Sequence, residues 1–398
     1  MSLANGRHYL AIPGPSVMPD RVLQAMHRPA PNIYHGELVD MTASIVRDLK
    51  LVARTSGSVA MYIANGHGVW EAGLANVLSR GDKVLALCTG GFGHGWADIA
   101  DAMGAQVERI DFGDAAPVET AQLAAALAAD TSHEIRAITL VQVDTATSVR
   151  NDIAAIRATI DAAGHPALLM VDCIACLGCD VLEMDAWGVD VMVTGSQKGL
   201  MTPPGMGFVF FSDRADAARD RADLVTPYWD WRPRVNPEQF YRYFFGTAPT
   251  HHLFGLRTAL DMILEEGVEP IWLRHARLAN AIWAAVDRWG EAGNIRPNIN
   301  DRSARSHAVT TVRMGDGNAA RLRAWLPDAV GVTLGIPIGE GLRDVSVDDL
   351  FRIGHMGHVN GQMVMGVLGA IQSGMSALQI PHAPGGLEAA ADVIGQAA

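Results

Sequence analysis

The sequence predicts an α/β fold, in which a large domain with a mostly parallel sheet between helices is followed by a smaller C-terminal α+β domain. Short β-rich runs alternate with amphipathic helical runs from about residue 59 to residue 211. After about residue 266 this alternation gives way to one long helical run and a mixture of strand and helix patterns. A length of 398 residues with 49% hydrophobic residues allows a large core and more than one domain.

The elements of the large domain follow from these periodicities. The clearest strand patterns cover residues 83–88, 106–111, 135–143, 167–172, 190–194 and 207–211. The clearest helix patterns between them cover residues 69–78, 119–128 and 153–163. Because ligands of such sheets bind beyond the carboxyl ends of the strands, we expect the functional residues there.

The C-terminal region predicts a second, smaller domain. A helical run over residues 269–289 leads into residues 306–314. A helix pattern at 319–325, a strand pattern at 350–353 and helix patterns at 362–378 and 387–397 follow. We therefore divide the chain into an N-terminal segment (1–18), a large domain (19–268) and a small domain (269–398).

Composition and charge narrow the classes of function. A formal net charge of −12, without any run of Lys or Arg, argues against a nucleic-acid partner. The most apolar stretches, such as residues 167–170 and 208–211, are too short to span a membrane. The N-terminal residues lack the pattern of a secretion signal and there are only four cysteines, so we expect a cytoplasmic protein without a disulfide framework.

Two successive strand patterns lead to side chains that can take part in a reaction. The strand over residues 168–172 ends on Asp172, and the strand that starts at residue 190 leads into a turn that carries Lys198. Taken singly, a lysine after a strand usually reaches solvent, and an aspartate there usually caps a helix. Together they match what pyridoxal phosphate requires, namely a lysine for its Schiff base and a carboxylate that keeps its pyridine nitrogen protonated.

Three further features support this interpretation. Residues 65–68 follow a strand pattern and open a helix, whose free N–H groups suit a phosphate dianion. Phe92 lies between glycines, which would let its ring settle over a flat cofactor. Arg352 lies within an apolar strand and needs an anionic partner, either a substrate carboxylate or an internal acid. No single feature is decisive, but their joint occurrence predicts a pyridoxal-phosphate enzyme.

Across nearly the whole chain these motifs resemble class V aminotransferases, in the alanine–glyoxylate and serine–glyoxylate aminotransferase group. The resemblance runs through residues 12–16, 65–72, 171–172, 194–199 and 351–357. It implies a fold type I transferase with a seven-stranded sheet and pyridoxal 5′-phosphate as cofactor. It also implies a ping-pong transfer of an amino group from serine, alanine or aspartate to a 2-oxo acid such as glyoxylate or pyruvate.

The resemblance assigns roles to individual residues. Lys198 would carry the Schiff base and move the substrate's α-proton, and Asp172 would pair with the pyridine nitrogen. Phe92 would stack on the ring, and Thr145 would lie near the phenolic oxygen. The phosphate contacts would come from Asn65, Gly66, His67 and Gln197.

The resemblance also implies how substrate and a second subunit are bound. Arg352 would hold the substrate carboxylate, helped by the backbone near Ser16. Thr247 would reach the phosphate of the neighbouring subunit, which implies a homodimer with shared active sites. No metal is implied.

Some positions depart from the relatives' pattern and leave the substrate open. Relatives often place a tyrosine three residues before Thr247, where this chain has Phe244, and strand alternation would turn Tyr243 to the opposite face. Tyr34 and His35 lie in a region that borders the substrate in relatives, and an aspartate donor is one option. Residues 352–357 also resemble pyridoxamine–pyruvate aminotransferase, which makes pyridoxamine an alternative substrate.

Three rival interpretations are weaker. Glycines at 91, 93 and 95 with Asp111 suggest a nicotinamide dehydrogenase, but Trp96 stands where the dinucleotide fingerprint needs Gly or Ala. Cysteines 173, 176 and 179 have the spacing of iron–sulfur ligands, yet no fourth cysteine follows, which favours a packing role. A cysteine desulfurase needs a reactive cysteine on a later loop, and none lies beyond Cys179.

Overall fold

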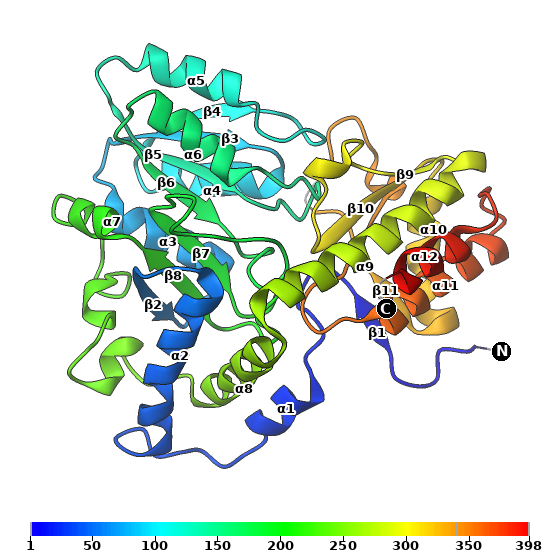
Figure 1. The fold of residues 1–398 in the computed structure, drawn as a ribbon, viewed down its shortest axis with the longest axis horizontal. Helices are drawn as coiled ribbons and strands as arrows, with labels where there is room; N and C mark the ends of the chain where they lie inside the picture. The colour runs from blue at the N-terminus through cyan, green and yellow to red at the C-terminus, as the bar shows by residue number, and fades with distance from the viewer. Residues whose placement is uncertain (1, 339–340, 397–398) are drawn as a thin grey trace.

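A computed structural model describes residues 2–338 and 341–396, and its larger part is built around one seven-stranded sheet (Figure 1). The strands lie in the order β2-β8-β7-β6-β5-β3-β4. Their bounds are β2 Ser58–Tyr62, β3 Lys83–Cys88, β4 Gln106–Asp111, β5 Ile135–Val141, β6 Leu168–Asp172, β7 Val191–Gly195 and β8 Gly207–Phe211. Strand β8 is antiparallel to β2 and β7, and the other pairs are parallel, which confirms the predicted sheet.

Helices cover both faces of this sheet, because successive side chains of a strand point to opposite sides. In β6, Leu169 and Val171 pack in one hydrophobic cluster, whereas Leu168 and Met170 pack in another. The first cluster includes α2, α5, α6 and α8, and the second includes α3, α4 and α7. The bounds are α2 Glu37–Ala53, α3 Gly66–Val77, α4 Gly91–Ala102, α5 Thr120–Ala129, α6 Ile153–Ala162, α7 Asp213–Ala218 and α8 Thr250–Glu266. The result is a three-layer α/β/α arrangement.

The predicted strand bounds differ most at β5. The strand predicted over residues 135–143 ends at Val141, because Val143 leaves the ladder and forms a bridge to Arg150 instead. The residues between the two bridge partners form a turn at the carboxyl end of β5, and this turn carries Thr145. The short helix α1 (Asp20–Met26) was not predicted.

The C-terminal part contains a three-stranded antiparallel sheet in the order β12-β10-β9, and helices pack against it. Helix α9 runs from the large sheet to these elements, as Figure 1 shows. The bounds are α9 Val268–Trp289, β9 Ile295–Pro297, β10 Val309–Met314, α10 Asn318–Val330, β11 Val332–Leu334, β12 Leu350–Gly354, α11 Gly361–Ala377 and α12 Gly386–Gly395. Short 3-10 helices are η1 Arg232–Arg234, η2 Phe240–Tyr243, η3 Gly290–Ala292, η4 Arg302–Ala304 and η5 Val347–Asp349. Residue 397, the end of the last predicted helix, lies outside the described residues.

The hydrophobic core divides inside α9. Trp272 packs against the cluster of the large sheet, whereas Leu278 belongs to the C-terminal cluster. This division lies close to the boundary predicted between residues 268 and 269, and the domain bounds themselves stay a prediction. Among the described helices, none combines the length and the apolar character needed to cross a bilayer.

The N-terminal segment connects the two parts of the molecule. Strand β1 (Tyr9–Ala11) pairs in parallel with β11 in the C-terminal part. The chain then reaches the turn after β7, where the N–H of Ser16 donates to the carbonyl of Gln197 (2.9 Å). The segment therefore brings its backbone to the carboxyl edge of the large sheet.

Candidate active site

A cavity with about 600 Å³ of empty volume lies at the carboxyl edge of the large sheet. Its walls include the predicted residues Asn65, Gly66, His67, Phe92, Thr145, Asp172, Gln197 and Lys198, together with Trp70, Val141, Val143, Ile174 and Ala175. Most of these lie in the segments that follow β2, β3, β5, β6 and β7. Residues far apart in the sequence meet here because the carboxyl ends of parallel strands share one edge.

Lys198 lies in the turn after β7, and the N-terminal segment packs directly against it. Its Nζ donates a hydrogen bond to the carbonyl of Pro13. The hydroxyl of Ser16 donates to the carbonyl of Lys198 (2.7 Å), which fixes the turn from the same segment. Gly14 has φ +110°, and a Cβ on it would lie 2.8 Å from Cδ of Lys198. The positive φ therefore favours glycine, and a larger residue would also displace the end of the Lys198 side chain.

The amine of Lys198 is easier to deprotonate than that of an ordinary lysine. Burial lowers its pKa to about 8, and the positive charge of Arg352 acts in the same direction. The carboxylate of Asp172 opposes the shift. The neutral amine, which is the nucleophilic and basic form, is therefore accessible near neutral pH.

Asp172 is the last residue of β6 and is buried, with 3% of its surface exposed. Its Oδ2 accepts a hydrogen bond from Nε1 of Trp70 (2.8 Å), and its Oδ1 accepts one from the N–H of Ile174 (2.6 Å). Burial raises the pKa of Asp172 to about 7, although these two donors oppose the shift. Such a group is suited to bind a cationic nitrogen inside the cavity.

Helix α3 begins at the cavity with unused backbone donors. Its N-cap is Asn65, whose Oδ1 accepts from the N–H of Gly68 (3.2 Å). Within the described residues, the N–H groups of Gly66 and His67 have no hydrogen-bond partner. The amide of Gln197 also leaves a buried Oε1 without a partner. Free N–H groups at a helix N-terminus attract a phosphate, and an unpaired buried oxygen indicates a missing polar partner.

Phe92 lies at the start of α4, and its ring lies beside the ring of Trp70. The two ring centroids are 6.2 Å apart with an interplanar angle of 71°. The N–H groups of Phe92 and Gly93 both donate to Oδ2 of Asp144, at 2.9 and 3.3 Å. A carboxylate from the turn after β5 therefore holds the aromatic residue that follows β3.

Arg352 approaches the site from β12 of the C-terminal part. It is buried, and its Nη1 donates to the carbonyl of Thr145 (2.8 Å) while its Nε donates to that of Ile336 (2.7 Å). Arg352 forms no ion pair with any acid that the structure describes. The internal acid that the sequence allowed as its partner is therefore not found among those residues. Burial lowers the pKa of Arg352 to about 10. An anion from outside the chain would satisfy this charge.

The predicted residues Ser16, Thr247 and Arg352 do not line the cavity itself. Both donors of Ser16 are used within the chain, by the carbonyls of Gln197 and Lys198. Thr247 is exposed in the loop before α8. The substrate and interface roles of these residues stay predictions.

The strand alternation expected around Tyr243 is wrong. The residues Phe240–Tyr243 form the 3-10 helix η2, because the carbonyl of Tyr241 accepts the N–H groups of Phe244 (3.2 Å) and Gly246 (3.1 Å) and turns the chain. Phe244 is buried, and Tyr243 packs beside it with ring centroids 6.2 Å apart. Tyr243 and Phe244 therefore do not lie on opposite faces of a strand.

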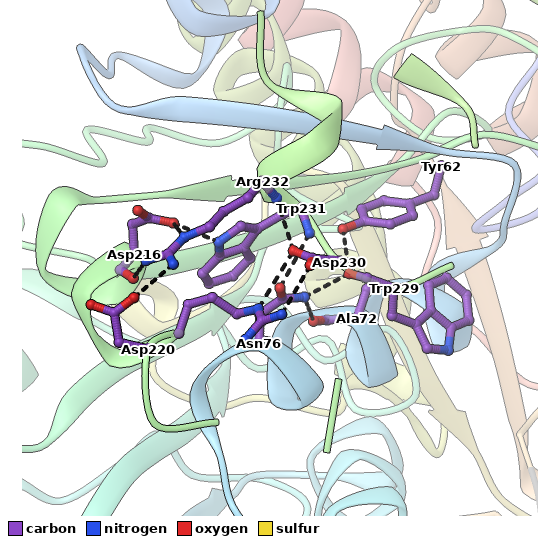
Figure 2. A network of polar contacts seen from close by, with 10 residues as sticks. Tyr62, Ala72, Asn76, Asp216, Asp220, Trp229, Asp230, Trp231 and Arg232 are labelled. Carbon is purple, nitrogen blue, oxygen red and sulfur yellow. Dashed lines mark hydrogen bonds and ion pairs between the residues drawn. The ribbon is translucent and has the colours of Figure 1, made fainter. Parts of the chain in front are cut away.

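A polar network fastens the segment after α7 to α3 and β2 (Figure 2). Asn76 of α3 donates to the carbonyl of Trp229 (2.6 Å), and its Oδ1 accepts the N–H of Trp231 (3.2 Å). The hydroxyl of Tyr62 donates to the same carbonyl of Trp229 (2.9 Å). Arg232 adds ion pairs to two aspartates of the network, as Figure 2 shows. The network thus supports the helix whose N-terminus opens the cavity.

Arg234 fixes the next part of this segment. It is fully buried, and its guanidinium donates to the carbonyls of Met61 (2.9 Å), Tyr228 (2.6 Å) and Tyr243 (3.0 Å). It also lies over the ring of Tyr62, 4.2 Å from the centroid. This arginine joins the end of β2 to the loop that leads to Thr247.

Trp70 and Asp144 are site residues that the sequence did not single out. Trp70 is four residues after Gly66 on α3, a spacing that places both on one helix face. This spacing is the feature of the sequence that could have indicated Trp70 as a site residue. The contacts of Asp144 with Phe92 join segments 52 residues apart, and no local pattern indicates them.

The residues behind the rival interpretations have other roles. Trp96 is buried and stacks on Trp70, with centroids 6.0 Å apart and an interplanar angle of 15°. Asp111 forms an ion pair with Arg343. The four cysteines are buried and unpaired. In the described ranges, no group of three or more His, Cys, Asp or Glu side chains could hold a metal ion.

Comparison with known proteins identifies relatives over more than nine-tenths of the chain. A model of the aminotransferase class-V family matches residues 70–337. The serine–glyoxylate aminotransferase of Methylorubrum extorquens is 36% identical, and the match covers 97% of this chain and 95% of the relative. The L-aspartate–glyoxylate aminotransferase of Paracoccus denitrificans is 35% identical, with coverages of 93% and 91%.

Solved structures show the same fold. The pyridoxamine–pyruvate aminotransferase of Mesorhizobium loti superposes with a TM-score of 0.88 at 27% identity, and the match covers 100% of both chains. The ureidoglycine–glyoxylate aminotransferase of Bacillus subtilis superposes with a TM-score of 0.85 at 23% identity, covering 99% of this chain and 100% of that one. Both matches extend from the large sheet through the C-terminal part.

Proposed function

Because this chain belongs to the class-V aminotransferase family, we propose that it is a transaminase that moves an amino group from serine, alanine or aspartate to a 2-oxo acid such as glyoxylate or pyruvate. We propose pyridoxal 5′-phosphate as its cofactor, bound in the cavity beside Lys198. The observation that carries the proposal is the convergence of a deprotonatable lysine, a buried carboxylate and free helix N–H groups in one cavity.

The cavity residues fit this cofactor in three respects. The free N–H groups of Gly66 and His67 offer a phosphate cradle. The oxygen of the Gln197 amide is not held by any partner within the described residues, so this amide can turn its NH₂ group toward a phosphate. Asp172 would hold the pyridine nitrogen, and Phe92 would cover the ring. When bound, pyridoxal phosphate supplies an aldehyde for attachment and a ring that accepts electrons from the substrate.

The chain's own residues would then move the proton. Nζ of Lys198 is the only ammonium group at this edge of the sheet, since the other lysines in the sequence are Lys50 on α2 and Lys83 at the start of β3. With its pKa lowered to about 8, this amine can take the α-proton of the substrate and later return a proton. Pro13 and Ser16 hold the lysine and its turn in place.

Arg352 would bind the substrate's carboxylate. Its Nη2 has no hydrogen-bond partner within the described residues, and a guanidinium held by two backbone carbonyls is already oriented. The buried positive charge forms no direct ion pair among those residues, although the charge of Asp144 acts on it from further away, and this favours an anionic ligand.

We also propose a homodimer in which Thr247 reaches the partner's cofactor phosphate. Large apolar side chains near Thr247 are exposed, namely Ile63 (43%), Tyr241 (52%) and Phe245 (47%). Tyr228 links this surface together, because its hydroxyl donates to the carbonyl of Ile63 (3.0 Å) and its ring packs on Phe245. A second copy covering this apolar surface would remove it from water. Sedimentation of the purified protein tests the dimer.

The four unpaired cysteines support the cytoplasm as the location, since disulfides are rare there. Cell fractionation tests this part of the proposal.

Pyridoxamine is the second candidate substrate. The overlap with the pyridoxamine–pyruvate aminotransferase, which covers both chains completely, favours including it. That reaction would use the same cavity but a free vitamin form in place of an amino acid. The two candidates therefore differ in what enters the cavity, not in the role of Lys198.

The test is a substrate panel with spectroscopic detection. The purified protein is loaded with pyridoxal phosphate and mixed in turn with serine, alanine, aspartate, glycine and pyridoxamine, while the absorbance of the bound cofactor is followed. We expect one of the small amino acids to remove the absorbance fastest, and glyoxylate or pyruvate to restore it. A protein that stays colourless and takes up no cofactor would contradict the proposal.

A further inference from the structure

Asp144 is a fully buried carboxylate to which the proposed reaction gives no role. It follows β5 and has 0% of its surface exposed. Its Oδ2 accepts the N–H groups of Phe92 (2.9 Å) and Gly93 (3.3 Å), and its Oδ1 accepts the N–H of Ala146 (2.9 Å). It forms no ion pair with any cation that the structure describes. Burying a carboxylate without a cation is costly, so three N–H donors and a helix N-terminus must compensate for it.

The two oxygens of Asp144 have different tasks. Oδ2 caps the start of α4, and Oδ1 holds the turn that contains Thr145 and Ala146. An asparagine of the same shape would offer only one acceptor oxygen, and its NH₂ group would face an N–H donor at the other position. The backbone of Gly90 lies very close to this carboxylate, since a Cβ added to Gly90 would lie 2.6 Å from Cγ of Asp144. The side chain at position 144 therefore has no room to shift.

Three groups of the candidate active site meet at this carboxylate. The backbone N–H of Phe92 donates a hydrogen bond to it. Thr145 is the next residue in the chain, and Arg352 donates to the carbonyl of Thr145. The negative charge also reaches further. Burial lowers the pKa of Arg352 and the charge of Asp144 opposes this, whereas burial raises the pKa of Asp172 and the charge of Asp144 adds to that rise. The ring-covering residue and the carboxylate-binding residue thus share one support.

We propose that Asp144 is a positioning residue that sets the placement of Phe92 relative to Thr145 and Arg352. It thereby couples cofactor binding to binding of the substrate carboxylate by Arg352. This inference rests on the proposed function. Asp144 touches neither cofactor nor substrate in this role and acts through the three residues that it supports.

A matched control lies at the other end of the same strand. Asp130 precedes β5, is also buried, and accepts the N–H groups of Glu134 (3.0 Å) and Ile135 (2.8 Å). It has no contact with the cavity walls. Asp130 also pairs with His165 (3.1 Å), a contact that Asp144 lacks. Asp144→Asn and Asp130→Asn therefore each remove one buried carboxylate that accepts backbone N–H groups, at opposite edges of the sheet.

The experiment measures cofactor affinity and kinetics for both variants. Titration of the cofactor-free proteins with pyridoxal phosphate, followed by tryptophan fluorescence and by circular dichroism of the bound cofactor, gives the dissociation constant and the ring environment. For Asp144→Asn we expect the dissociation constant and the KM of the amino donor each to rise about tenfold, the scale of one lost charge-assisted hydrogen bond. The dichroism of the bound cofactor should change as well. For Asp130→Asn both constants should stay within about twofold of the wild type, because only stability is affected.

A second variant covers the case in which Asp144→Asn does not fold. Gly90→Ala keeps the carboxylate but pushes a methyl group against it, and we expect the same changes in a weaker form. Variants at position 144 or 90 that match Asp130→Asn in affinity, KM and dichroism would overturn the positioning role while the wild type still transaminates. A wild-type protein that takes up no pyridoxal phosphate would overturn the proposed function, and this inference with it.

Discussion

Strand β5 has a buried aspartate near each of its ends, and the surroundings of these two carboxylates differ. At the amino end, Asp130 pairs with the ring of His165 (3.1 Å) and with two backbone N–H groups. Although burial opposes the shift, these donors lower the pKa of Asp130. At the carboxyl end, Asp144 has N–H donors only, and burial raises its pKa.

Strands β6 and β7 repeat the contrast. Before β7, burial raises the pKa of Asp190, and Arg214 (3.5 Å) and Arg157 (3.9 Å) oppose this shift. After the same strands come Asp172 and Lys198, whose pKa values burial moves to about 7 and about 8. Burial thus acts at both edges. At the carboxyl edge, arginine or histidine pairs with Asp111 and with Asp180, but Asp144, Asp172 and Lys198 form no ion pair within the described residues.

The difference separates residues that stabilise the fold from residues available for chemistry. Charges paired within the chain have nothing left to offer a ligand, whereas charges with shifted pKa values and unused hydrogen-bonding capacity do. The same strands supply both kinds, so the partners around a charged residue, and not its type alone, indicate its role.

The largest effect is expected at the carboxyl edge from Lys198→Ala. Transamination should fall on the order of 10²–10⁴-fold or more, because the residue that moves the proton is lost. Single-turnover rates with the preferred donor measure this. The pKa of Lys198 is lowered in the folded state, so cofactor-free wild type should gain stability as pH rises from about 8 toward 10.5, and the variant should lose that dependence. Near-normal transamination by Lys198→Ala would contradict the assignment.

Asp172→Asn should have the next largest effect. We expect kcat to fall about 10²–10³-fold, the scale of losing one preorganised electrostatic partner. The pKa of Asp172 is raised from 3.8 to about 7 on folding, so its contribution to stability is present at low pH and is lost as pH rises through 7. Urea unfolding of the cofactor-free proteins should show wild type losing stability relative to the variant over that range. Parallel pH profiles for both proteins would refute the shifted pKa.

Arg352→Gln should act mainly on substrate binding. Loss of the charge-assisted contact to a carboxylate should raise the KM of the amino acid about tenfold or more. Pyridoxamine has no carboxylate, so its KM should change little if it is a substrate. Steady-state kinetics with both donors test this, and an unchanged amino-acid KM would remove Arg352 from the substrate site.

At the amino edge, Asp190→Asn should affect stability alone. Removing this charge takes away the acid of Arg214 and one of the two acids of Arg157, which also pairs with Asp161, and we expect the free energy of unfolding to fall by about 1–3 kcal/mol. Cofactor affinity, kcat and KM should stay at wild-type values, measured under conditions where the variant is folded. A kinetic effect at this edge would break the comparison between the two edges.

The sequence predicted the parts of the site that depend on local pattern. Lys198 and Asp172 follow apolar strands, and residues 65–67 open a helix, so periodicity alone placed them at the carboxyl edge. Contacts between distant segments could not be predicted in this way. Trp70 meets Asp172 across 102 residues, and Arg352 meets Thr145 across 207. Their pairing depends on tertiary packing, which one sequence does not display.

The prediction failed where a short segment lacked periodicity. Around Tyr243 the chain forms a 3-10 turn held by the carbonyl of Tyr241, and the strand assumption misplaced its side chains. Thr247 illustrates a different limit, since its predicted partner would lie on another subunit. The dimer therefore requires a measurement in solution.

The most direct test of the central claim is to locate the lysine that bonds to the cofactor. The protein is loaded with pyridoxal phosphate, the bond is reduced with borohydride, and the modified peptide is identified by mass spectrometry. We predict that the label lies on Lys198. A label on Lys50 or Lys83, or no label at all, would contradict the assignment of the active site to the carboxyl edge of the sheet.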